Sequence, residues 1–199
     1  MFYPDFSAWL HLETLRFQAW PIVTYLSDAR TQEGMVLPAL ISIALSIAYL
    51  RRIKDPDVIL GFLLFAMTIG ISTAYWGVTG LHTFTANIIL WPVLVFLLGD
   101  RLPWPMVYPL AFLGTLVPDL YGAGMSTHWT NAWFFGVGGA GWQDGLFWVP
   151  LKTLMAAALL HHFGNTLRQH GYFHRRTPLS EDVCFTGIEN HRRTKGEQP

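Results

Sequence analysis

Long apolar runs alternate with short polar links through most of this chain. At about 1.5 Å of rise per residue, an apolar helix of roughly 20 residues crosses the ~30 Å hydrocarbon core of a bilayer. The sequence predicts five such helices, near residues 34–50, 55–79, 84–99, 105–120 and 145–163. The expected fold class is therefore all-α: a polytopic helical membrane protein with about five transmembrane helices.

Capping residues and prolines add detail to three of these spans. Asp55 and Pro56 suit the N-cap and the first helical position of the second span, and Asp144 suits the N-cap of the fifth. Pro109 and Pro118 lie in the fourth span, where a proline frees a backbone carbonyl, and both are expected to bend the helix. The starts of the second and fifth helices thus follow from capping chemistry as well as from hydropathy.

Small residues predict where helices meet. Ala66, Gly70 and Ala74 recur every four residues in the second span, and Ser42 and Ser46 do so in the first. Small residues at this spacing let neighbouring helices approach closely in a membrane. The second helix is therefore expected to be central and tightly packed.

The two ends of the chain differ from the bundle of residues 34–165. In residues 1–33, apolar positions recur at roughly helical spacing, which predicts an interfacial amphipathic helix in a periplasmic N-terminal segment or a helix packed on the outside of the bundle. If residues 8–27 crossed the membrane, the number of spans would be six. Residues 166–199 are polar and form a predicted cytoplasmic tail that carries at most a short continuation of the last helix.

Composition supports the membrane class and excludes other classes. The chain is 52% hydrophobic and 13% charged, whereas soluble domains average about 25% charged residues. The formal net charge is zero, and no basic stripe indicates a nucleic-acid partner. The single cysteine, Cys184, cannot form an intramolecular disulfide. The sequence assigns no cofactor.

Basic residues predict the orientation. With five spans, ten of the 13 Lys and Arg residues fall on one side, while Arg16 and Arg30 fall on the other and Lys152 lies within a span. Because Lys and Arg near span ends stay in the cytoplasm, we expect a multi-pass protein of the cell inner membrane with its N-terminus outside and its C-terminus in the cytoplasm. The ten are Arg51, Arg52, Lys54, Arg101, Arg168, Arg175, Arg176, Arg192, Arg193 and Lys195.

A Gly/Trp-rich segment, residues 121–144, lies on the outer side in this topology. Tryptophans there are typical of an interfacial belt, but a belt does not explain the glycines between them. Glycines framed by tryptophans favour a docking surface for a partner subunit, a lipid or a lipid-linked ligand, and this binding or assembly role is the leading prediction. Expected partners are membrane lipid and a protein partner or a second copy of the chain. The predicted binding residues are Trp129, Asn131, Trp133, Gly138, Gly139 and Trp142.

The same side also collects residues that could carry chemistry. His82, Asp119 and His128 are the ligand types of a zinc or iron site, and Asp144 could be a fourth group. Such a site would activate a bound water for hydrolysis, so a membrane-embedded metal-dependent hydrolase is the main alternative function. No paired ligand spacing within the sequence supports the metal.

Two short stretches resemble a family of membrane-bound metal-dependent hydrolases. Pro118-Asp119-Leu120 is similar to that family's Pro-Asp-x-Asp motif, and Thr127-His128 is similar to its Thr-His-Ser motif. Tyr121 replaces the second aspartate and Trp129 replaces the serine. The resemblance therefore carries no family assignment.

Lys152 lies about eight residues, or ~12 Å, along a helix from Asp144. A lysine at such depth needs a partner, a water-filled cavity or a route by which its ammonium reaches the interface. Three interpretations remain open: an ion pair with Asp119, a side chain that snorkels to the interface, or a catalytic or transport role. The last would make the protein a small transporter or channel component.

Overall fold

The computed structural model describes residues 25–77, 80–82, 86–126 and 137–171. The chain divides into two compact units, residues 1–162 and 163–199, and the helical bundle belongs to the first. Most of the N-terminal segment 1–33 and of the tail 166–199 lies outside the described residues, as does the interfacial helix predicted there. The described residues are almost entirely helical, which confirms the helical fold class at that level.

The first apolar run forms one continuous helical stretch, Ala29–Arg52. The Asp28 carboxylate caps it by accepting hydrogen bonds from the backbone N–H groups of Arg30 and Thr31, at 3.1 and 3.2 Å. The helix therefore begins before residue 34, the predicted start. Its successive parts are α3 (Ala29–Thr31), the π-helical η2 (Gln32–Val36), α4 (Leu37–Tyr49) and the 3-10 helix η3 (Leu50–Arg52).

The second helix, α5 (Pro56–Thr73), begins with Asp55 at its N-cap, as predicted. The Asp55 side chain makes no capping hydrogen bond; its carboxylate forms an ion pair with Arg101 at 3.1 Å. The helix ends before residue 79, the predicted end. It is followed by β1 (Tyr75–Gly77) and β2 (Gly80–His82), which pair antiparallel in a small hairpin that the sequence did not predict.

The next two helices differ in length. Helix α6 (Asn87–Leu98) has 12 residues, or about 18 Å, which is shorter than the ~30 Å hydrocarbon core. Helix α7 (Val107–Ser126) has 20 residues and contains Pro118. Pro109 lies in its first turn, where a missing N–H costs no helical hydrogen bond, so the bend predicted at Pro109 has no physical basis. Three short 3-10 helices complete the links: η4 (Gly99–Arg101), η5 (Trp104–Met106) and η6 (Gly141–Gln143).

The last helix, α8 (Gly145–Gln169), starts where the sequence predicts and runs on beyond residue 163. By length and apolar composition, three helices of the described residues could cross a membrane: Ala29–Arg52, α5 and α8. Large apolar side chains remain exposed on the helices of the bundle, as lipid-facing helices require. Examples are Leu40, Ile43 and Ile47 on α4, Leu60, Leu64 and Phe65 on α5, and Met155 and Leu159 on α8.

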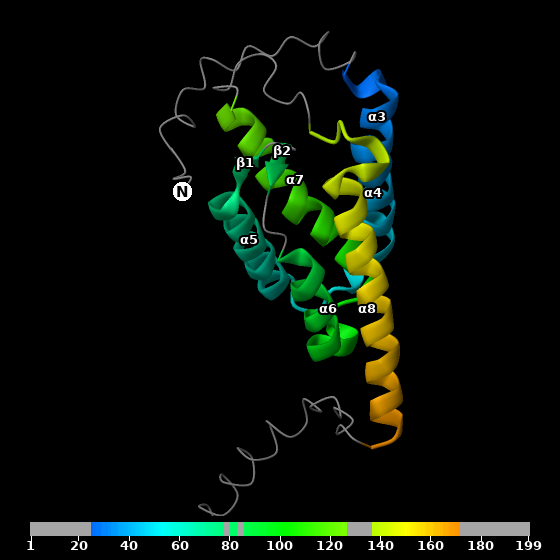
Figure 1. The fold of residues 1–199 in the computed structure, drawn as a ribbon. Coiled ribbons are helices and arrows are strands. Elements are labelled where there is room, and N and C mark those ends of the chain that lie inside the picture. The colour runs from blue at the N-terminus through cyan, green and yellow to red at the C-terminus, as the bar shows by residue number, and fades with distance from the viewer. Residues whose placement is uncertain (1–24, 78–79, 83–85, 127–136, 172–199) are drawn as a thin grey trace, which may run out of the picture. The chain divides into compact units, whose positions relative to one another are not determined.

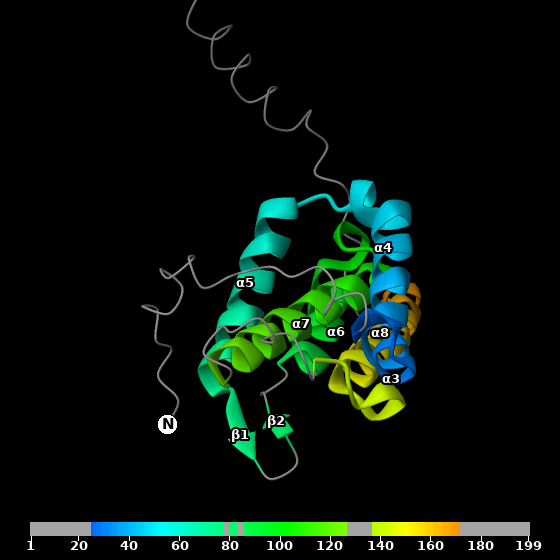
Figure 2. The ribbon, with the colours of Figure 1, turned by 90° about the horizontal axis from the view of Figure 1, so that it is seen from above.

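Helix α7 packs against α5, α4 and α6, and the view from above shows it between α5 and α4 (Figure 2). Ala66 and Gly70 are buried on α5, which confirms this part of the predicted small-residue ridge, and Ala74 is buried directly after the helix ends. A Cβ on Gly70 would lie only 2.5 Å from Cγ of Pro118 on α7. The close approach of α5 and α7 therefore depends on the absence of a side chain at residue 70.

A polar network is buried between α6 and α7. The Asn87 amide donates to the Thr115 hydroxyl at 3.3 Å, and the Asn87 carbonyl oxygen accepts from the Trp91 indole at 2.9 Å. The Thr115 hydroxyl donates to the backbone carbonyl of Ala111 at 2.9 Å. Because Gly114 has no side chain, Asn87 can lie directly against its Cα. Each polar group shown here is paired, as burial in an apolar bundle demands.

Candidate functional site

The basic links and the glycine turn lie at opposite ends of the first helix. At one end, the Lys54 N–H donates to the Arg101 carbonyl at 3.1 Å, so the α4–α5 and α6–α7 links touch. At the other end, the turn around Gly138 packs against η2, which precedes α4 (Figure 1). The structure thus separates most of the described basic residues from the Gly/Trp-rich segment, as the charge pattern predicts.

Residues 121–126 of the Gly/Trp-rich segment form the end of α7, which runs beyond residue 120, the predicted end of this helix. The later described part, residues 137–144, is anchored on the first helix through glycines. A Cβ on Gly34 would overlap the carbonyl oxygen of Gly138 and would lie 3.0 Å from that of Gly141. Gly138 and Gly141 have φ angles of 77° and 62°, a left-handed conformation that other residues rarely adopt. The Tyr25 hydroxyl donates a further hydrogen bond to the Val137 carbonyl, next to Gly138. Three glycines therefore fix this turn in place.

The π-helical register of η2 is part of this contact. The Leu37 N–H bonds to the Gln32 carbonyl, five residues back, which inserts one residue relative to an α-helix. Gly34 lies in the middle of this widened turn and is buried. Met35, the next residue, has its Cβ 2.5 Å from the position that a Cβ on Gly138 would take. The widened turn of η2 and the turn around Gly138 therefore fit closely against each other.

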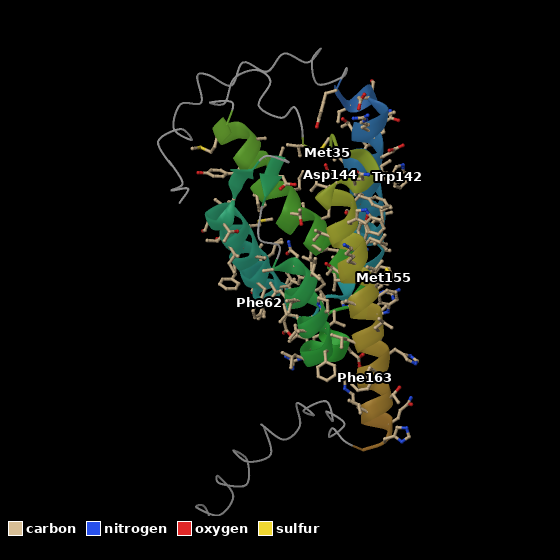
Figure 3. All side chains as sticks on the ribbon, viewed as in Figure 1. Met35, Phe62, Trp142, Asp144, Met155 and Phe163 are labelled. Atoms are coloured by element: carbon tan, nitrogen blue, oxygen red, sulfur yellow. The ribbon has the colours of Figure 1, made fainter. Side chains whose placement is uncertain are left out.

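Asp144 ends the glycine turn and starts α8. One carboxylate oxygen accepts from the Leu146 N–H at 2.9 Å, and the other accepts from the Ala140 N–H at 3.3 Å, which confirms the predicted N-cap. Burial raises the pKa of the Asp144 carboxyl, and these two hydrogen bonds to the charged form offset part of that rise. Figure 3 shows Asp144 at the same end of the bundle as Met35 and Trp142.

Two of the predicted chemical groups come together here. Asp119, partly buried in the second half of α7, is close enough to Asp144 for the two carboxylates to interact electrostatically. Strand β2, which ends at His82, contacts α7. His128 lies outside the described residues, and the part of the chain that the structure describes holds no group of three or more metal-ligating side chains. The described residues therefore show α7 in contact with β2, and the predicted metal site stays a prediction.

An aromatic row runs from the glycine turn onto the exposed side of α8. The Trp142 and Phe147 rings meet edge to face at 4.8 Å, and the Phe147 and Trp148 rings do so at 5.5 Å. Trp142 is 50% exposed and Trp148 is 42% exposed. The Lys152 ammonium lies over the Trp148 ring, 5.5 Å from its centroid. The three rings and the Lys152 ammonium thus form one continuous series of contacts.

Lys152 is exposed, and among the described residues no carboxylate lies within ion-pair distance of it. Of the three interpretations of Lys152, its contact with Trp148, one turn nearer the start of α8, agrees best with a side chain that reaches toward the interface. The ion pair with Asp119 does not form in this structure.

The structure describes three of the six predicted docking residues. Trp129, Asn131 and Trp133 lie outside the described residues. Gly138 is buried against Met35, Gly139 is partly buried and Trp142 is half exposed. Sequence reasoning missed Gly34 and Phe147. A glycine at the start of an apolar run was the only signal for Gly34, and nothing in the sequence paired it with residue 138.

Comparisons with protein-family models, with curated proteins and with solved structures gave no match.

Proposed function

We infer that this chain is a multi-pass protein of the cell inner membrane, with its N-terminus outside, its C-terminus in the cytoplasm and about five spans. Three helices of sufficient length and hydropathy support the membrane assignment. The contact between the two basic links supports the sidedness, because it places Lys54 and Arg101 at one end of the bundle. In this proposal α6 completes its crossing with the help of its flanking segments, since its own 12 residues are too few.

We propose a binding or assembly role for the outer end, which would dock a partner subunit, a lipid or a lipid-linked ligand. The observation that carries this proposal is the glycine anchor. Gly34, Gly138 and Gly141 fix the turn on the first helix, and the fixed turn presents Trp142 half exposed beside it. A rigid aromatic side chain that is already positioned loses little conformational freedom on binding, which makes tryptophan a common anchor of interfaces.

Photo-crosslinking in native membranes tests this role. A photoreactive amino acid replaces Trp142 in one variant and Ile47, 80% exposed on α4, in a matched control. The proposal expects a discrete adduct of defined mass from position 142 that position 47 does not give, because position 47 faces bulk lipid. Identical adduct patterns at the two positions would mean that the Trp142 surface docks nothing specific.

A metal-dependent hydrolase remains the second candidate. Its support is the proximity of Asp119 to Asp144 and the contact of β2, which carries His82, with α7. Zinc or iron held by His82, Asp119 and His128 would supply an activated water. Metal analysis of the purified protein, with His82→Ala and His128→Ala, tests this candidate: loss of a bound metal in both variants supports it, and unchanged metal content counts against it. The transporter interpretation loses its main support, because Lys152 is exposed instead of lining the interior of the bundle.

A further inference from the structure

One face of α8 combines a cation, aromatic rings and exposed apolar side chains in a fixed order. Trp148, Lys152, Met155 and Leu159 are spaced by four, three and four residues, so they lie on one side of the helix. All four are exposed, Met155 by 59% and Leu159 by 72%. Figure 3 shows Met155 farther along α8 than Asp144 and Trp142.

The cation on this face lacks an anion from the described part of the chain. The nearest acidic residue in sequence is Asp144, whose two carboxylate oxygens already accept from Leu146 and Ala140. Asp28, at the same end, caps α3 by accepting from the N–H groups of Arg30 and Thr31. A lysine side chain on the apolar surface of a spanning helix is costly unless its ammonium meets an anion or water. No ion pair among the described residues neutralises Lys152, so an anion at the interface could do so.

Along this face, the aromatic and cationic side chains come first and the apolar side chains follow, which matches the headgroup and the acyl chains of a phospholipid. The rings of Trp142, Phe147 and Trp148 form a wall next to the Lys152 ammonium, at the level where aromatic side chains contact lipid headgroups. Met155 and Leu159 continue the same face deeper along the helix, where acyl chains lie. A phosphate near Lys152 and acyl chains along Met155 and Leu159 would satisfy both the charge and the apolar surface.

We propose that this face binds an anionic phospholipid, with the headgroup phosphate against Lys152 and Trp148 and the acyl chains on Met155 and Leu159. This inference rests on the proposed membrane placement of α8 and names the lipid class that the outer end recognises. Anionic and zwitterionic phospholipids share the phosphate. The unpaired Lys152 favours the anionic class, because a zwitterionic headgroup brings its own cation.

Native mass spectrometry of the full chain tests the inference. The protein is released from nanodiscs that contain equal amounts of phosphatidylglycerol and phosphatidylcholine, and the ratio of the two retained lipids is measured. The wild-type protein is expected to retain phosphatidylglycerol several-fold over phosphatidylcholine. Lys152→Met should bring the ratio close to one, and Lys152→Arg should preserve the preference. Lys152→Gln provides the same comparison if Lys152→Met does not fold.

A matched control removes a similar cation elsewhere. Arg52 lies 5.1 Å from the centroid of the Tyr49 ring at the other end of the bundle, so Arg52→Met deletes a cation–π pair and one charge without touching α8. The inference requires a smaller change in the lipid ratio for Arg52→Met than for Lys152→Met. Equal changes, or an unchanged ratio in both Lys152→Met and Lys152→Gln, overturn it.

A photoreactive amino acid at Met155 separates a lipid from a protein occupant. Adducts with phospholipid support the inference, and a discrete protein adduct at Met155 overturns it in favour of a partner helix. The broader docking role is judged separately at position 142. A specific adduct there with no lipid preference at Lys152 would remove only the present inference.

Discussion

Gly34 and Gly138 meet backbone to backbone across more than a hundred residues of sequence, so closely that a Cβ on Gly34 would overlap the Gly138 carbonyl oxygen. The contact joins the widened turn η2 to the turn that leads into α8. Because the opposing atoms belong to the backbone, they cannot move aside as the end of a flexible side chain could. This pair therefore determines where the turn around Gly138 sits on the first helix.

We predict that Gly34→Ala destabilises the protein by about 1–3 kcal/mol, the usual cost of forcing an extra methyl group into a filled space. Gly61→Ala is the matched control. A Cβ on Gly61, within α5, would meet nothing within 4 Å, so alanine should be neutral or stabilising by up to about 1 kcal/mol through its better helix propensity. Thermal unfolding in detergent measures both. Equal melting temperatures for the two variants would contradict the close contact.

A second prediction concerns the buried network between α6 and α7. Thr115→Val removes the hydroxyl that accepts from the Asn87 amide and leaves that amide without its partner. The expected loss is about 1–2 kcal/mol, which is typical of an unsatisfied buried group between membrane helices. In Thr68→Val, the deleted hydroxyl is exposed and bonds only the Leu64 carbonyl, so its loss should cost much less. A similar melting temperature for the two variants would mean that the network contributes nothing.

The comparison of sequence and structure separates local signals from long-range ones. The Asp144 cap and the ridge of Ala66, Gly70 and Ala74 were predictable, because capping chemistry and four-residue spacing are written in short stretches. The end of α5 at Thr73 was not, because the apolar run continues through residues that form the hairpin instead. Hydropathy reports that a segment is apolar and does not by itself distinguish a helix from a short hairpin.

The candidate site shows the same division. The sequence marks Asn87 as the one strongly polar residue of its span but cannot identify Thr115 as its partner. Gly34 has no side chain whose chemistry could indicate a contact. Whether Lys152 is buried depends on which face of α8 packs against the bundle. The residues around it in sequence are mostly apolar, so the sequence does not indicate that face. The structure resolves that question by placing its ammonium over Trp148.

A third prediction concerns pH. Burial raises the pKa of Asp144 in the folded protein above its ordinary value of 3.8, so the folded state favours the neutral carboxyl. The contribution of Asp144 to stability is then fully present below pH 3.8 and is lost as the pH rises through the higher folded pKa. Asp144→Asn does not titrate and keeps a capping oxygen. As the pH rises above 3.8, the melting temperature of the wild type should therefore fall relative to that of Asp144→Asn.

Asp144→Ser provides the control, because serine caps a helix without titrating. The two variants should share a flat pH response at this position even if their absolute stabilities differ. A melting-temperature difference between wild type and Asp144→Asn that is constant with pH would show that the carboxyl is not perturbed by burial.

The last prediction concerns the two ends of the bundle. The hydrogen bond from the Lys54 N–H to the Arg101 carbonyl requires the α4–α5 and α6–α7 links to lie on one side of the membrane. With Cys184 replaced by serine, single cysteines at the exposed positions Lys54, Asp100 and Ala140 can be labelled by a membrane-impermeant maleimide. Cysteines at 54 and 100 should react only after the inner membrane is opened, because Lys and Arg are retained in the cytoplasm. A cysteine at 140 should react before that step. Labelling of 54 and 100 from different sides would contradict the contact between the links. Labelling of 54 and 100 before that step, with 140 reacting only after it, would leave the fold intact but reverse the proposed outer face. Labelling of all three from one side would contradict the placement of the links and the glycine turn at opposite ends of the bundle.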